Sequence, residues 1–173
     1  GGASVINIPV FLALGIPIPL ATAMQKLSST FWVLPAAYNY LHDRKVDWRF
    51  LFIFAFIGLG GAYLGVLVVI HLNQRLMQVI IGSLILVLVG YTFYNRNLGT
   101  SEQQSYSPIR RFFSYPFAVI LGFYESIFGS GNGILFSMVG LYTRGFDFVD
   151  ALGYYYGIAF FWVIFAAGIL IQK

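Results

Sequence analysis

Residues 115–142 decide the fold, and they read YPFAVILGFYESIFGSGNGILFSMVGLY. Two apolar pieces, 115–128 and 134–142, lie on either side of the turn sequence GSGNG at 129–133. At about 1.5 Å per helical residue, each piece is too short to cross a hydrocarbon layer about 30 Å thick. Glycine enters backbone conformations that other residues avoid, so we expect two half-length helices joined by a tight turn.

The composition places this hairpin in a membrane. Apolar residues make up 59% of the chain and charged residues 9%, whereas soluble domains are about one-quarter charged. We therefore expect one all-α, polytopic transmembrane bundle over residues 1–173. Full crossings are predicted at 19–41, 50–70, 77–94 and 148–171, with a further half-length helix at 4–14. Irregular backbone at membrane depth is stable only against protein or a water-filled cavity, so the hairpin tip should line a site.

A weak internal repeat relates the two ends of the chain. Residues 1–21 parallel residues 131–151 at an offset of about 130, each copy running from a Gly-rich tip through a short apolar helix and a Gly turn into a long helix. We expect a first repeat at 1–94, a linker at 95–114 and a second repeat at 115–173. If the hairpin is re-entrant, the copies are inverted, as in many secondary transporters. If 129–133 only kinks a single crossing, the copies are parallel.

Positive charge gives the bundle an orientation. The re-entrant hairpin places seven Lys and Arg residues on one face and two on the other, whereas a kinked crossing would soften this bias to six and three. Because cations gather on the cytoplasmic side, the loops 42–49, 95–114 and 143–147 are predicted to be cytoplasmic. No basic cluster with interleaved aromatics occurs, so we expect a lipid bilayer and no nucleic acid as partner. The oligomeric state stays open, a homo-oligomer included.

Lys26 is the one cation inside a predicted span, roughly 10 Å deep by the helical rise. Insertion at such a depth costs on the order of 2.5 to 3.5 kcal/mol, so the side chain should have a partner. Lys26 could attract an anionic substrate, with Thr22, Gln25 and Ser29 as hydrogen-bonding groups on the same helix. The alternative is that it reaches toward the interface or forms a purely structural ion pair.

Glu125 lies four residues before the Gly turn, near the middle of the membrane. A carboxyl group buried there is expected to be protonated or paired. We predict a proton-coupling or gating role for it. The alternative is a structural partnership with Lys26 or with a backbone amide.

Each Gly-rich tip leads into a helix, so free N–H groups and the positive end of the helix dipole should point into the cavity and bind anions. The predicted substrate-binding residues at the tips are Gly2, Ala3, Ser4, Gly129, Ser130, Gly131, Asn132 and Gly133.

Enzymatic functions are excluded by what the chain lacks. A serine hydrolase built on FGSG at 128–131 needs a base near the nucleophile, but His42 and His71, the only histidines, are predicted at opposite membrane edges. The same positions exclude a haem carrier. With no cysteine, thiolate metal sites and cysteine nucleophiles are also absent. We expect no catalytic residue, metal ion or cofactor. Because the chain begins at Gly1 inside an apolar run, we expect it to be a piece of a longer protein.

Several stretches, in order along nearly the whole chain, resemble the sulfite exporter TauE/SafE family, also called the toluene-sulfonate uptake permease family. They are GASVINIP at 2–9, GIP at 15–17, ATAMQKL at 21–27, VDWR at 46–49, GFYE at 122–125 and GSGNG at 129–133. The resemblance implies a bacterial-type inner-membrane transporter of sulfite, sulfonates or related organosulfur anions, with helices before and after the present chain. This chain departs from the family in its short tip at 1–3 and in Tyr155-Tyr156, which match Gln25-Lys26 in the second repeat.

The sequence therefore predicts a secondary transporter or permease that moves a small anion by alternating access. The alternative is a non-transporting membrane scaffold or assembly subunit, whose polar groups only join helices. An aqueous cavity that reaches Lys26 and the tip at 129–133 would favour the transporter, and a dry, fully packed midplane would favour the scaffold.

Overall fold

The computed structural model describes residues 3–71 and 107–172, together with positions 73, 75, 76, 79, 83, 86, 87 and 90. Among the residues so described there is no strand, and the predicted all-α class is confirmed. The helices are α1 (Ala3–Ala13), α2 (Ile18–Leu41), α3 (Trp48–His71), α5 (Pro108–Phe112), α6 (Tyr115–Ile127), α7 (Asn132–Arg144) and α8 (Phe148–Ile171). Most of the predicted crossing at 77–94 and most of the linker at 95–114 lie outside the described residues.

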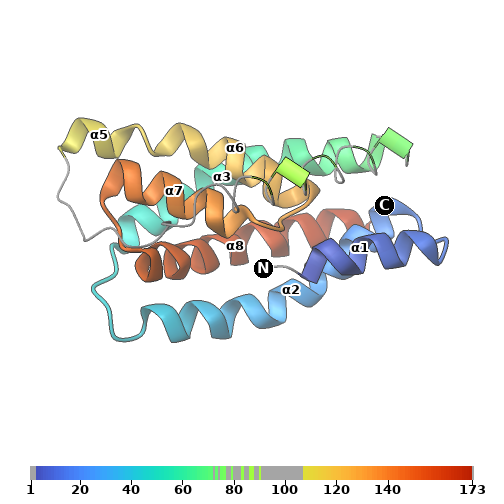
Figure 1. Ribbon diagram of the computed structural model, residues 1–173, viewed down its shortest axis with the longest axis horizontal. Helices are drawn as coiled ribbons and strands as arrows, with labels where there is room; N and C mark the ends of the chain where they lie inside the picture. The colour runs from blue at the N-terminus through green and yellow to red at the C-terminus, as the bar shows by residue number, and fades with distance from the viewer. Residues whose placement is uncertain are drawn as a thin grey trace.

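Three helices run along the long axis of the molecule (Figure 1). Two of them, α3 and α8, have 24 residues each and are long and apolar enough to cross a membrane. The third, α2, is equally long. Its first half is less apolar because it carries the buried polar residues Thr22, Gln25, Lys26 and Ser29. A helix with a polar stripe of this kind has to face protein rather than lipid.

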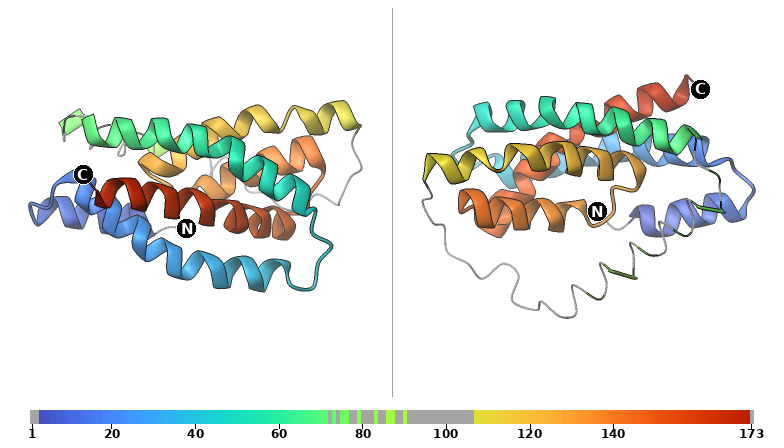
Figure 2. Two further views of the ribbon diagram at one scale, coloured as in Figure 1. Left: turned by 180° about the vertical axis from the view of Figure 1, so that it is seen from behind. Right: turned by 90° about the horizontal axis from the view of Figure 1, so that it is seen from above.

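The hairpin predicted from 115–142 is present and re-entrant. Helix α6 runs from the end of the bundle at α5 to its middle, and α7 returns to the same end (Figures 1 and 2). Gly129 and Gly131 in the turn have φ of 74° and 77°, in the left-handed region that only glycine enters without cost. The alternative of a single kinked crossing is therefore wrong.

The predicted inverted arrangement is also visible. Helix α1 runs from the middle of the bundle to one end and is followed by α2, whereas α7 runs from the middle to the opposite end and is followed by α8 (Figure 1). Matching turns join each pair, with Gly15 at φ 79° and Gly145 at φ 73°. The long helices α2 and α8 pack against each other and run in opposite directions (Figure 1). The exact limits of the two repeats stay a prediction.

Small residues bring α3 and α6 into close contact. A Cβ added to Gly61 would collide with the backbone of Val119, and one added to Gly122 would collide with the backbone of Gly58. The buried Trp162 of α8 also contacts α3, where it donates a hydrogen bond from Nε1 to the carbonyl oxygen of Ala55 at 2.9 Å. Helix α6 is thus held rigidly against α3, and this fixes the depth of the hairpin tip.

Ion pairs join the α2–α3 loop to the α7–α8 turn at the end of the bundle where α5 lies. Arg44 Nη1 lies 2.8 Å from Asp147 Oδ2 and 2.5 Å from Asp150 Oδ1, and these hydrogen bonds raise the pKa of Arg44. Burial alone would raise the pKa of Asp147, but hydrogen bonds from the Asp150 amide and from Arg44 outweigh it and hold this pKa below its ordinary value. These ion pairs hold the α2–α3 loop against the start of α8 at this end of the bundle.

Candidate functional site

The two charged residues predicted for the membrane interior form an ion pair. Lys26 of α2 is 2% exposed and Glu125 of α6 is 4% exposed. The Lys26 Nζ atom lies 3.1 Å from Glu125 Oε1 and also donates to the backbone carbonyl oxygen of Glu125. No other charged side chain is buried in the part of the chain that the structure describes. Lys26 therefore points into the bundle and not toward the interface.

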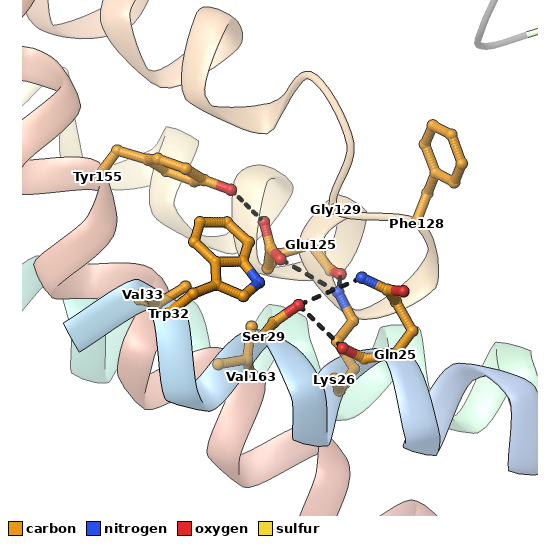
Figure 3. Close-up of a pocket in the computed structure, with 10 residues that line it drawn as sticks. All are labelled: Gln25, Lys26, Ser29, Trp32, Val33, Glu125, Phe128, Gly129, Tyr155 and Val163. Carbon is orange, nitrogen blue, oxygen red and sulfur yellow. Dashed lines mark hydrogen bonds and ion pairs between the residues drawn. The ribbon is translucent and has the colours of Figure 1, made fainter. Parts of the chain in front are cut away.

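Two further donors hold the second oxygen of the carboxylate. Asn132 Nδ2, at the start of α7, lies 2.8 Å from Glu125 Oε2. The Tyr155 hydroxyl of α8 lies 2.9 Å from the same oxygen, and Figure 3 shows this contact. Asn132 Nδ2 also donates to the carbonyl oxygen of Leu121 at 3.1 Å. Burying a charge is costly unless it is paired and hydrogen-bonded. Here three helices supply donors to one carboxylate.

The hairpin turn is shaped around this carboxylate. A Cβ on Gly129 would lie 2.5 Å from Glu125 Oε1 and 2.7 Å from Lys26 Nζ, so a side chain would push into the ion pair. The Tyr124 hydroxyl donates to the carbonyl oxygen of Ser130 at 2.6 Å, which fixes the turn to its own helix. Glycine is thus required at 129 both for the left-handed backbone and for the approach to the ion pair.

A second group of hydrogen bonds lies beside the ion pair on α2. Gln25 Nε2 donates to Ser29 Oγ at 3.4 Å, and Ser29 Oγ donates to the Gln25 carbonyl oxygen at 2.9 Å. Asn7 Nδ2 of α1 donates to Gln25 Oε1 at 2.8 Å. The half-helix α1 is therefore joined to the site through Gln25, as the half-helix α7 is joined to it through Asn132.

A small cavity lies beside the Lys26–Glu125 ion pair and the Gln25–Ser29 hydrogen bonds. Its volume is about 20 Å³, and it is lined by Gln25, Lys26, Ser29, Glu125 and Gly129 together with aromatic and apolar side chains from α2, the hairpin turn and α8. This is room for about one water molecule. A sulfonate group, with three oxygens on one sulfur, does not fit. The space beside the ion pair is therefore too small for a substrate anion in this conformation.

The structure places the predicted site residues differently. Gln25, Lys26, Ser29, Gly129 and the predicted coupling residue Glu125 line the cavity, and Asn132 binds the carboxylate without lining it. Thr22 is buried one turn earlier on α2. The remaining residues of the turn have structural contacts, since Gly131 precedes α7 and a Cβ on Gly133 would lie 3.1 Å from the Tyr155 ring.

The first Gly-rich tip is described only in part. Gly2 lies outside the described residues, and Ala3 and Ser4 form the start of α1 with side chains that are also outside them. Helix α1 begins near the middle of the long axis, at a depth similar to that of the α6–α7 turn (Figures 1 and 2). The role of these three residues in substrate binding stays a prediction.

Sequence reasoning missed two residues of the site. Tyr155 binds Glu125, and its position 130 residues after Gln25 was the signal that could have identified it. Asn7 binds Gln25 and is a lone amide within an apolar half-helix, which is a pattern that requires a polar partner in a membrane.

Comparison with known proteins gives the family. The family described as "Sulfite exporter TauE/SafE" matches residues 1–173. The chain is 29% identical over 152 residues to a "Probable membrane transporter protein" of Haemophilus influenzae, covering 87% of this chain and 59% of that protein. It is 29% identical over 153 residues to "Probable membrane transporter protein ORF9" of a Sinorhizobium species, with coverage of 87% and 58%.

A third relative extends the same result. "Probable membrane transporter protein YfcA" of Escherichia coli K12 is 25% identical over 162 residues, covering 87% of this chain and 56% of that protein. The chain thus spans 56–59% of the length of these relatives. No solved structure matches it significantly. The resemblance seen in the sequence is confirmed, and this helical membrane protein belongs to the sulfite exporter TauE/SafE family.

Proposed function

We propose that this chain forms the core of a secondary transporter that carries a small anion through the membrane by alternating access, with Lys26 as the attracting charge. The observation that carries the proposal is the Lys26–Glu125 ion pair, buried where the hairpin tip meets the polar half of α2. The family and the names of the relatives support membrane transport. Sulfite and sulfonates are the substrates that the family description suggests.

Physical chemistry supports a functional reading of the pair. Burying two charges costs solvation free energy that their mutual attraction regains only in part, so apolar residues in place of a buried ion pair are often equally stable. Stability alone therefore gives little reason for a buried ion pair here. An ammonium group at this depth, in a medium of low dielectric constant, attracts an anion far more strongly than it would in water. The inverted arrangement of α1–α2 and α7–α8 provides two units that could rock against each other around a fixed site.

We propose a gating role for Glu125, which the small size of the cavity supports. Its carboxylate occupies the position next to Lys26 Nζ that a substrate anion would need, and the remaining space of about 20 Å³ holds about one water molecule. An anion therefore binds only after the carboxylate has moved or lost its charge. In this proposal Glu125 protects the lysine between transport events.

We place the protein in the bacterial inner membrane, with the loops 42–49, 95–114 and 143–147 on the cytoplasmic side. The support is the positive-inside rule. Arg44, Lys45, Arg49, Arg110 and Arg111 belong to the end of the bundle at α5, together with Arg144 at the end of α7. Substrate anions would then pass between this end and the turn at Gly15.

Uptake by proteoliposomes tests the proposal. We expect the purified full-length protein to take up labelled sulfite or a taurine-like sulfonate above the level of empty liposomes. Lys26→Gln should reduce the initial rate at least about tenfold, which corresponds to 1.4 kcal/mol, because the attracting charge is gone. Lys45→Gln, an exposed lysine in the α2–α3 loop, is the matched control and should keep the rate.

A second candidate function is favoured by the small cavity and by the tight crossing of α3 and α6. A non-transporting membrane scaffold or assembly subunit needs no opening, and its ion pair would only join helices. Absence of uptake for every anion tested, in a protein that is folded and correctly inserted, would favour the scaffold over the transporter. In either case no catalytic residue, metal or cofactor is proposed.

A further inference from the structure

We propose that the site binds monovalent oxyanions together with one proton each, so that transport is electroneutral and dianions are excluded. The inference rests on the proposed function, because it assumes that the anion binds at Lys26. It goes further in naming the co-transported ion, the stoichiometry and the charge of the substrate. The co-transported ion, the stoichiometry and the substrate charge are all inferred from the groups that surround Glu125.

Charge balance limits which ions can bind beside Lys26. Lys26 and Glu125 are the buried charges of the described chain, and together they sum to zero. An anion that entered beside an ionised Glu125 would place two negative charges against one ammonium group in a medium of low dielectric constant, which is strongly unfavourable. If Glu125 takes up a proton, the site carries one positive charge and a monovalent anion restores neutrality.

The hydrogen-bond donors around the Glu125 carboxylate are arranged to hold a group with two oxygens. Lys26 Nζ lies 3.1 Å from Glu125 Oε1, and Asn132 Nδ2 and the Tyr155 hydroxyl lie 2.8 Å and 2.9 Å from Oε2. The three donors come from α2, α7 and α8 and converge on an anionic group with two oxygens. A sulfonate or a carboxylate presents the same kind of oxygen edge. The substrate head can therefore take the place of the Glu125 carboxylate once that group is neutral and displaced.

Among the described residues, Glu125 is the one buried carboxyl group, and it lies beside Lys26. The titratable side chains around Glu125 are Lys26 from α2, Tyr155 from α8 and Tyr124 from α6 itself. Helix α7 contributes the amide of Asn132, and α3 has no charged residue between Phe50 and Ile70. Glu125 is thus the carboxyl group available to exchange a proton with the water that accompanies the anion. The proton binds a carboxylate oxygen on one side and leaves from it on the other.

The test uses full-length protein in proteoliposomes that contain a pH-sensitive dye, with methanesulfonate as the probe. We expect one proton to enter with each methanesulfonate ion. The final accumulation should be the same with and without a potassium diffusion potential. Uncompensated movement of one charge would change the accumulation about fiftyfold at 100 mV. Sulfate, a dianion, should compete at least about tenfold more weakly than methanesulfonate, a difference of 1.4 kcal/mol.

Glu125→Gln gives the discriminating variant. It resembles the protonated side chain, so exchange of internal for external methanesulfonate should persist while the accompanying proton uptake is lost and net uptake becomes voltage-dependent. Tyr156→Phe, at the residue next to Tyr155, is the matched control and should leave the coupling unchanged. If the Glu125→Gln protein does not fold, the number of protons taken up per methanesulfonate and the voltage response of the unmodified protein still test whether transport is proton-coupled.

The outcomes separate the two proposals. Methanesulfonate flux without protons, a voltage-dependent accumulation, or equal competition by sulfate would overturn the coupling inference and leave anion transport standing. Absence of flux for methanesulfonate, sulfite and taurine alike would remove the proposed function itself. Electroneutral, proton-linked flux that is resistant to sulfate supports both.

Discussion

The stability of the bundle should respond to charge at positions 26 and 125 as a pair and not as two separate sites. Removing one partner of a buried ion pair leaves an uncompensated charge and typically costs about 3 to 5 kcal/mol. Lys26 and Glu125 meet the conditions for this range, since they are 2% and 4% exposed and their charged atoms lie 3.1 Å apart. We therefore expect Lys26→Gln and Glu125→Gln each to destabilise the protein by this amount.

Thermal unfolding in detergent, followed by the fluorescence of the three tryptophans, measures the effect. For a chain of this length 1 kcal/mol shifts Tm by about 2 to 4 °C, so each single variant should unfold about 6 to 20 °C earlier. The double variant has no unpaired charge and should be more stable than either single one. Strictly additive losses, with the double variant the least stable, would refute the pairing. Lys45→Gln again serves as the surface control, with a shift close to zero.

Three further changes test the local geometry. Gly129→Ala should lower the stability more than Gly15→Ala. Both positions have a left-handed backbone, which costs alanine about 1 to 2 kcal/mol, but only the Cβ at 129 would meet the ion pair. The difference between the two Tm values isolates that contact, and equal Tm shifts would contradict it. Gly122→Ala should separate α6 from α3 and lower Tm, whereas Gly60→Ala, with open space around its Cβ, should be neutral or raise Tm. Asp147→Asn should lower Tm at pH 7, and the difference from the unmodified protein should shrink as the pH falls below about 4. The reason is that the lowered pKa of Asp147 stabilises the fold above the unfolded-state pKa, and this contribution is lost as the pH drops through the folded-state pKa; a difference that is independent of pH would exclude this cause.

The helices were predictable because lipid imposes a simple rule on the sequence. A span of apolar residues either is long enough to cross or is not, and 50–70 and 148–171 passed this test, as α3 and α8 do in the structure. The half-helices α1, α6 and α7 also agree with the prediction to within a few residues. Glycine marked the turns between them because few other residues adopt a positive φ.

The site was predictable only in part. A charged side chain inside the membrane needs a partner. Lys26 and Glu125 were candidate partners for each other, so the sequence suggested their pairing as a hypothesis. The contacts of Tyr155 and Asn7 could not be derived. Each depends on the rotation of a helix about its axis, and a helix that is apolar on most sides has no pattern that sets this rotation.

The sequence by itself determined that this protein is a helical membrane bundle, that two of its helices are broken by glycine turns, and that a lysine and a glutamate lie at membrane depth. These follow from composition, length and local backbone preference, which act within a few residues along the chain. Only the tertiary structure decided that the hairpin is re-entrant, that the Glu125 carboxylate accepts hydrogen bonds from donors on three helices, and that little space remains beside it. Such features depend on how helices far apart in the sequence pack, because it is the sum of many weak contacts between them that sets distances of a few ångströms.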